Sequence, residues 1–177
     1  MFGKAKKLLD RSLEILLTVV MTILVLDVVW QVFTRFVMKD PSQWTEELAT
    51  YLMIWVAMLG ASVALYRGAH LGIDYFVGKL ATRKRLYTEV FVFFLIGAFS
   101  LTVMLIGGIQ LVLDFLDLGQ PSPAMGIEMG YVYLALPISG FFLTIYSIEL
   151  MIGKIIALVK HRPDGPHPGT EMTQAGD

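Results

Sequence analysis

Four long apolar stretches, separated by shorter polar segments, organise this chain of 177 residues. They cover residues 13–37, 44–66, 86–113 and 131–159. Each exceeds the roughly 20 residues that a helix needs to cross about 30 Å of hydrocarbon. The alternating apolar and polar positions of membrane β-strands are absent, and a helix satisfies its backbone polar groups internally. The pattern predicts an all-α membrane protein, with residues 1–160 as a domain of four transmembrane helices.

The composition agrees with this class, because 16% of the residues are charged, against about 25% in soluble domains. The chain has no cysteine, which excludes thiolate metal sites and iron–sulfur clusters. A haem would need paired histidines inside the apolar stretches, but the three histidines lie outside them, at His70, His161 and His167. We find no nucleophile–base or phosphate-binding motif and no basic patch for nucleic acid. We therefore expect neither an enzyme nor a bound cofactor.

The basic residues indicate the orientation in the membrane. Of the 14 lysines and arginines, four precede the first apolar stretch, five lie between the second and third, and three lie near the end of the fourth or after it. By the positive-inside rule, both termini and the middle loop are cytoplasmic. Residues 161–177 are polar and rich in proline and glycine, so we expect a disordered cytoplasmic tail there.

A short amphipathic segment lies between the second and third stretches. Its apolar residues follow a helical spacing at Ile73, Phe76, Val77 and Leu80. This predicts an interfacial helix over about residues 70–82, too short to cross the bilayer, lying flat on the cytoplasmic surface. The polar residues assigned to this helix and to lipid contact are Arg67, His70, Asp74, Arg83, Lys84 and Arg85.

Three polar residues lie on one face of the first stretch. Asp27, Gln31 and Arg35 are spaced four apart, so they share one side of a helix. A charge at the centre of a membrane helix costs about 2.5 to 3.5 kcal/mol on insertion scales. This face is therefore expected to meet protein or water rather than lipid.

The short turn between the first two stretches makes their helices antiparallel neighbours. Counting from the turn places Arg35 level with Glu46 and Glu47, and Asp27 level with Trp55. We expect Arg35 to pair with one of the two glutamates and Asp27 to accept a hydrogen bond from Trp55, because buried charges are normally paired. The alternative is that Asp27, Glu46 or Glu47 carries an ion or a proton, as intramembrane acids often do.

Small residues on the second stretch predict a surface for contact with another subunit. Ala57, Gly60, Ala61 and Ala64 have overlapping small-xxx-small spacings, which let a second helix approach closely. Trp44, at the start of the same stretch, is a further interface candidate.

Several motifs carry a family resemblance. They are Val32 with Arg35-Phe36, Trp44-Thr45-Glu46-Glu47-Leu48, Trp55, Leu59-Gly60-Ala61, Arg67, His70, Asp74, Ser122-Pro123-Ala124 and the segment from Tyr133 to Pro137. With these motifs the chain strongly resembles the small integral membrane subunit (Q or DctQ type) of tripartite ATP-independent periplasmic (TRAP) transporters. The resemblance extends to Lys160 and is most specific from Arg35 to Asp74.

The resemblance implies a protein of the bacterial inner membrane that pairs with a larger membrane subunit. That subunit would hold the substrate and sodium sites, and a soluble periplasmic binding protein would deliver an organic acid, such as a dicarboxylate or sialic acid. The small subunit would act as a scaffold. Two other interpretations stay open, namely a stand-alone small transporter or channel that forms homo-oligomers, and a membrane assembly factor.

Overall fold

The computed structural model describes residues 2–40, 42–67 and 82–160, and all of its regular elements are helices. The elements are α1 (Phe2–Phe33), the π-helical segment η1 (Thr34–Met38), α2 (Gln43–Tyr66), α4 (Thr82–Phe99), the π-helical segment η2 (Ser100–Gly107), α5 (Gly108–Leu118), α6 (Met129–Tyr133) and α7 (Ala135–Lys160). They combine into four helices that are long and apolar enough to cross a membrane. The predicted all-α class and the four apolar helices are thereby confirmed.

Two predicted segments cannot be compared with this structure. The expected tail, residues 161–177, lies outside the described residues. So does the expected interfacial helix, except that Thr82 begins α4.

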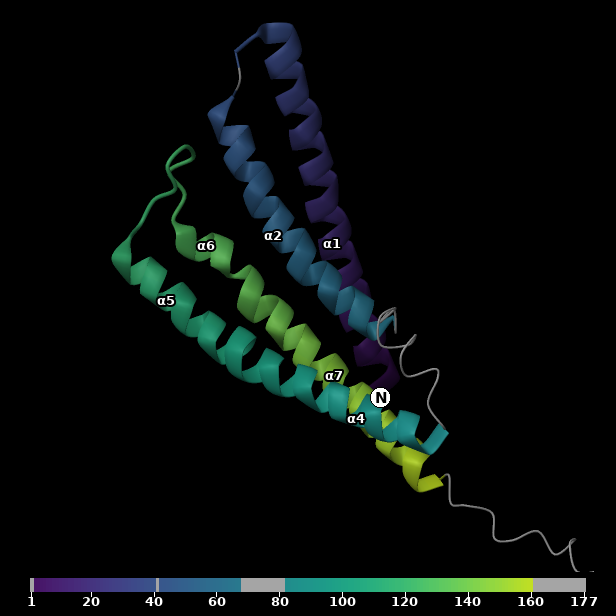
Figure 1. Cartoon of the computed structure of the whole chain (residues 1–177). Helices are drawn as coiled ribbons and strands as arrows, with labels where there is room; N and C mark the ends of the chain where they lie inside the picture. Colours follow the sequence, from purple (N-terminus) through teal and green to yellow (C-terminus); the bar gives the residue numbers. More distant parts are fainter. Residues whose placement is uncertain (1, 41, 68–81, 161–177) are drawn as a thin grey trace, which may run out of the picture.

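The four long helices form two hairpins that meet along α2 and α7. Helix α1 packs against α2, α2 packs against α7, and α7 packs against α4 and η2. The two hairpins lie close together near the N-terminus and diverge towards α5, α6 and the turn after η1 (Figure 1). The result is an open arrangement in which α1 and α4 are edge helices.

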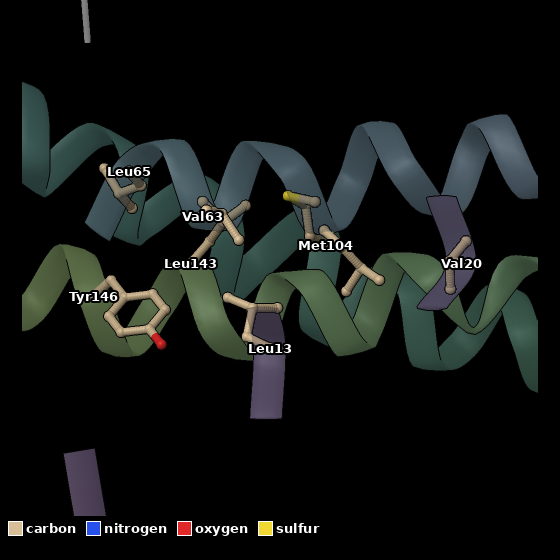
Figure 2. Packing of buried hydrophobic residues seen from close by; sticks show 8 residues of the cluster. Leu13, Val20, Val63, Leu65, Met104, Leu143 and Tyr146 are labelled. Atoms are coloured by element: carbon tan, nitrogen blue, oxygen red, sulfur yellow. The ribbon is translucent and has the colours of Figure 1, made fainter. Parts of the chain in front are cut away.

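The main cluster of buried apolar residues lies where the hairpins converge. Figure 2 shows the side chains that α1, α2, η2 and α7 contribute to this region, with Val20 at its edge. The cluster consists of Leu13, Val20, Leu59, Val63, Leu65, Met104, Leu143 and Tyr146. Elsewhere the helices are exposed. In the most apolar 18-residue window of each long helix, at most 22% is buried inside the protein. Most of the apolar surface is therefore available to lipid or to a partner.

Backbone features explain where several helices end. Lys39, with φ 57°, and Gly119, with φ 55°, adopt the left-handed conformation that commonly ends a helix. Pro137 has no amide hydrogen and its ring crowds the carbonyl group four residues earlier, at Tyr133. Helix α6 ends at Tyr133, and α7 begins two residues later.

Gly140 allows the close approach of α7 to η2. A Cβ atom added to Gly140 would lie 2.8 Å from Met104 Cβ and 2.9 Å from the backbone nitrogen of Leu105. The buried Ser100 and Thr144 join the same two elements by a hydrogen bond of 3.0 Å between their hydroxyl oxygens. The contact therefore depends on the absence of a side chain at residue 140.

We predict that Gly140→Ala lowers the free energy of unfolding by about 1–3 kcal/mol, as expected for overpacking. Gly153→Ala is the matched control, because a Cβ atom there would meet nothing within 4 Å. Unfolding in detergent, followed by circular dichroism, measures both variants. Equal stability of the two variants would show that α7 and η2 do not pack as described.

Candidate functional site

A carboxylate at the start of α2 clamps the loop between α5 and α6. Glu47 accepts hydrogen bonds from the backbone N–H groups of Ala124, at 2.8 Å, and Met125, at 3.0 Å. It also accepts one from the hydroxyl of Tyr51, whose oxygen lies 3.2 Å from Met129 Sδ. These contacts tie the first hairpin to the second at the end where the two diverge.

The clamped loop is held in one shape by its own backbone. The N–H of Ser122 donates to the carbonyl of Ile127 at 2.8 Å, and that of Gly126 donates to the carbonyl of Ser122 at 3.1 Å. The N–H of Met129 donates to the carbonyl of Gln120 at 3.1 Å. The loop is therefore an ordered surface feature.

A second polar cluster joins the hairpins at their convergent end. Glu14 of α1 accepts hydrogen bonds from the Tyr66 hydroxyl and from Arg67 Nη2, the latter at 2.6 Å. The bond to Glu14 raises the pKa of Arg67, so the guanidinium stays charged. Asp10 accepts a hydrogen bond of 2.8 Å from the hydroxyl of Tyr146. Helix α1 is thereby tied to both α2 and α7.

Two ion pairs extend this second cluster. Lys6 of α1 pairs with Glu149 of α7. Lys154 of α7 pairs with Glu89 of α4 at 2.6 Å, and Glu89 is only 6% exposed. Opposite charges thus connect α7 to both edge helices.

The predicted pairing of Arg35 is not formed. Arg35 is exposed, and among the described residues no ion pair joins it to Glu46 or Glu47. Glu47 instead binds Tyr51 and the loop. Arg35 lies in η1, where π-helical winding changes the direction of side chains from that of a straight α-helix. Counting from the turn had fixed the depth of Arg35 but not its direction.

Asp27 is buried without the predicted partner. It is 7% exposed, and its Oδ2 has no hydrogen-bond partner in the structure as described. No hydrogen bond joins Asp27 to Trp55 within these residues, and Gln31 is half-buried on the same helix. The expected ladder of side chains across the first hairpin is therefore not present.

The predicted contact surface on α2 is open. Ala57 and Ala61 are exposed, Ala64 is half-buried, and a Cβ atom at Gly60 would meet nothing within 4 Å. Trp44 is 46% exposed at the start of the helix. These residues are accessible, and their role as a subunit interface stays a prediction.

Of the residues predicted for lipid contact, the structure describes the side chain of Arg67 alone. Arg67 is bound to Glu14. Arg83, Lys84 and Arg85 belong to the first turn of α4, but their side chains are outside the described part, as are His70 and Asp74.

The sequence analysis missed the tyrosines that complete both clusters. Tyr51 follows Glu47 by four residues, a spacing at which two side chains of a helix meet. Counting from the turn after the first helix also places Glu14 level with Tyr66 and Arg67. Both of these contacts could therefore have been predicted from the sequence. No sequence pattern indicates the contact between Asp10 and Tyr146.

The described residues contain no group of three or more histidine, cysteine, aspartate or glutamate side chains that could hold a metal ion. The carboxylates of the two clusters bind neighbouring tyrosines, cations and backbone N–H groups, and so connect helices. The polar side chains of both clusters therefore hold the membrane helices in a fixed arrangement.

Residues 8–156 match the family model described as tripartite ATP-independent periplasmic transporters, DctQ component. The chain belongs to this family. This DctQ-type protein is thus a small subunit of a TRAP transporter, and its four apolar helices make it a multi-pass protein of the bacterial inner membrane.

Individual relatives support the assignment. The sialic acid TRAP transporter small permease protein SiaQ of Vibrio cholerae is 28% identical over 159 residues, which cover 88% of this chain and 86% of SiaQ. The C4-dicarboxylate TRAP transporter small permease protein DctQ of Rhodobacter capsulatus is 30% identical over 62% of this chain and 48% of DctQ. The sialic acid TRAP transporter permease protein SiaT of Haemophilus influenzae is 31% identical over 67% of this chain, but over only 19% of its own length.

We predict that Glu47→Ala releases the loop between α5 and α6. Without the carboxylate, the N–H groups of Ala124 and Met125 exchange with solvent deuterium about tenfold faster, since each loses a charge-assisted hydrogen bond. Glu46→Ala is the matched control, because Glu46 is exposed and its side chain makes none of these contacts. Hydrogen exchange read by mass spectrometry distinguishes them, and unchanged exchange in the Glu47 variant would refute the clamp.

Proposed function

We propose that this DctQ-type protein anchors the large transport subunit of a sodium-coupled, binding-protein-dependent TRAP transporter that imports an organic acid. The substrate class is that of a dicarboxylate or sialic acid, because the relatives named above are permeases for C4-dicarboxylates and sialic acid. The larger subunit holds the substrate and sodium sites, and this chain serves as its scaffold.

Two relatives favour a large membrane subunit as the partner. The matched region makes up 19% of SiaT of Haemophilus influenzae and 18% of the isethionate TRAP transporter permease protein DctMQ of Oleidesulfovibrio alaskensis. In both, a segment similar to this chain is part of a much longer permease. Because this chain matches 86% of the small permease protein SiaQ, we propose that it forms a heterodimer with such a large subunit.

The open arrangement of the helices is the observation that best supports a scaffold. Helix α1 packs against α2, and α4 against α7, so broad apolar faces of both hairpins are left uncovered. On α2 one such face carries Ala57 and Ala61, whose small side chains let another helix approach closely. Polar clusters at both ends of the helices give these faces a fixed shape.

The proposed orientation places the loop between α5 and α6 on the periplasmic side. This ordered loop has exposed acidic residues on or beside it, at Asp117 and Glu128. We propose that it is the part of this chain nearest to the docked periplasmic binding protein, while the opposite end contacts anionic lipid headgroups.

We predict that the two ends of the helices differ in accessibility to a membrane-impermeant maleimide. The chain has no cysteine, so Gln120→Cys and Lys160→Cys each introduce a single reactive thiol at an exposed position. By the positive-inside rule, residue 120 is labelled in spheroplasts and residue 160 only after the membrane is permeabilised. Labelling of residue 160 in sealed spheroplasts would contradict the orientation.

Reconstitution tests the function directly. The tagged chain, produced together with a large TRAP membrane subunit from the same organism, should co-purify with it as a heterodimer. Proteoliposomes containing both proteins and the binding protein should accumulate the organic acid only under an inward sodium gradient. Proteoliposomes containing this chain alone should show no uptake. Uptake by the chain alone would overturn the proposal in favour of a stand-alone transporter, and failure to co-purify would favour an assembly factor.

A further inference from the structure

The second hairpin carries a groove between α4, η2 and α7, with a volume of about 310 Å³. Its lining is almost entirely apolar and includes Phe94, Ala98, Leu101, Ile148 and Met151. Phe94, Leu101 and Ile148 are all more than 40% exposed, so the groove opens onto the outside of the helix pair. In a bilayer this surface faces hydrocarbon or a neighbouring protein.

The hydroxyl groups in the groove require no partner from an occupant. Thr144 Oγ1 donates to the carbonyl of Gly140 at 2.7 Å, and Ser147 Oγ donates to the carbonyl of Thr144 at 3.0 Å. Thr102 Oγ1 donates to the carbonyl of Ala98 at 2.7 Å. An occupant without hydrogen-bonding groups, such as a hydrocarbon chain, therefore leaves no polar group unsatisfied.

The length and lining of the groove suit a hydrocarbon chain. The lining on α4 and η2 extends from Phe93 to Thr102, about 13 Å along the axis, which is close to half of the roughly 30 Å hydrocarbon core. The groove therefore extends over about the depth of one leaflet.

A cation and an aromatic residue continue the groove towards the convergent end of the hairpins. Lys154 lies three residues beyond Met151 on α7, and its side chain is 36% exposed. An ammonium group has three donors, so one can serve Glu89 and another a phosphate oxygen. Tyr87 of α4 is 54% exposed, and tyrosine is enriched at the level of lipid headgroups.

We propose that this groove binds one acyl chain of a glycerophospholipid whose phosphate lies at Lys154. The site does not depend on the proposed partner subunit, since its lining and its cation come from this chain. Bound lipid would extend the packing between α4 and α7 on their outer side.

Native mass spectrometry of the full-length, detergent-purified chain with added dioleoylphosphatidylglycerol tests the site. The wild-type chain should retain one tightly bound phospholipid. Ala98→Phe fills the groove and should weaken binding about tenfold or more, which is the effect of losing contacts to two methylene groups. Leu95→Phe is the control, because Leu95 is exposed on the same helix but does not line the groove.

Ala98→Leu provides a smaller filling variant in case the phenylalanine variant does not fold, and it should also weaken binding. Dioleoylglycerol, which has the same acyl chains without the phosphate, should bind more weakly than dioleoylphosphatidylglycerol. Equal binding of the two probes would overturn the phosphate assignment. Unchanged phospholipid binding in Ala98→Leu would overturn the lipid site. In a parallel co-purification with the large subunit, an Ala98 variant that loses the large subunit but keeps its bound phospholipid would also overturn it.

Discussion

The contact between α2 and α7 holds this protein together, because the two hairpins meet there before they diverge (Figure 1). Membrane helices gain no hydrophobic advantage from leaving lipid, so close packing and polar contacts must stabilise their association. Ser62 and Ser139 are fully buried at this contact, and Ser62 Oγ donates to the carbonyl of Ser139 at 3.3 Å. Small side chains there allow the backbones to approach.

The two polar clusters add hydrogen bonds and ion pairs to the packing contacts between the helices. Glu47 binds the loop of the second hairpin, and Glu14 and Asp10 connect α1 to α2 and α7. These groups lie near the helix ends, where water and headgroups lower the cost of burying charge. Away from the helix ends, the buried polar residues that the structure describes are uncharged, such as Ser62 and Ser139, except for Asp27. A framework with uncovered apolar faces suits the scaffold role proposed above.

The sequence predicted the class and number of helices because an apolar stretch of more than 20 residues has few other structures available to it in a membrane. It also pointed to the family through residues such as Trp44, Glu46 and Glu47. It did not predict the partners of Glu47, because the N–H groups of Ala124 and Met125 lie 77 and 78 residues away and carry no side-chain pattern. It did not predict the direction of the Arg35 side chain, because residues Thr34–Met38 wind as a π-helix.

The open arrangement of the two hairpins is tested most directly by the distance between the edge helices. Spin labels on cysteines at Val29 of α1 and Leu113 of α5, both exposed, report it by pulsed electron paramagnetic resonance in nanodiscs. Helices packed in the order α1, α2, α7 and α4 are separated by three interaxial spacings, which predicts about 25 Å or more. In a closed four-helix bundle the first and third long helices are neighbours or lie on the diagonal of the bundle, about 10 to 15 Å apart, and that result would contradict this account.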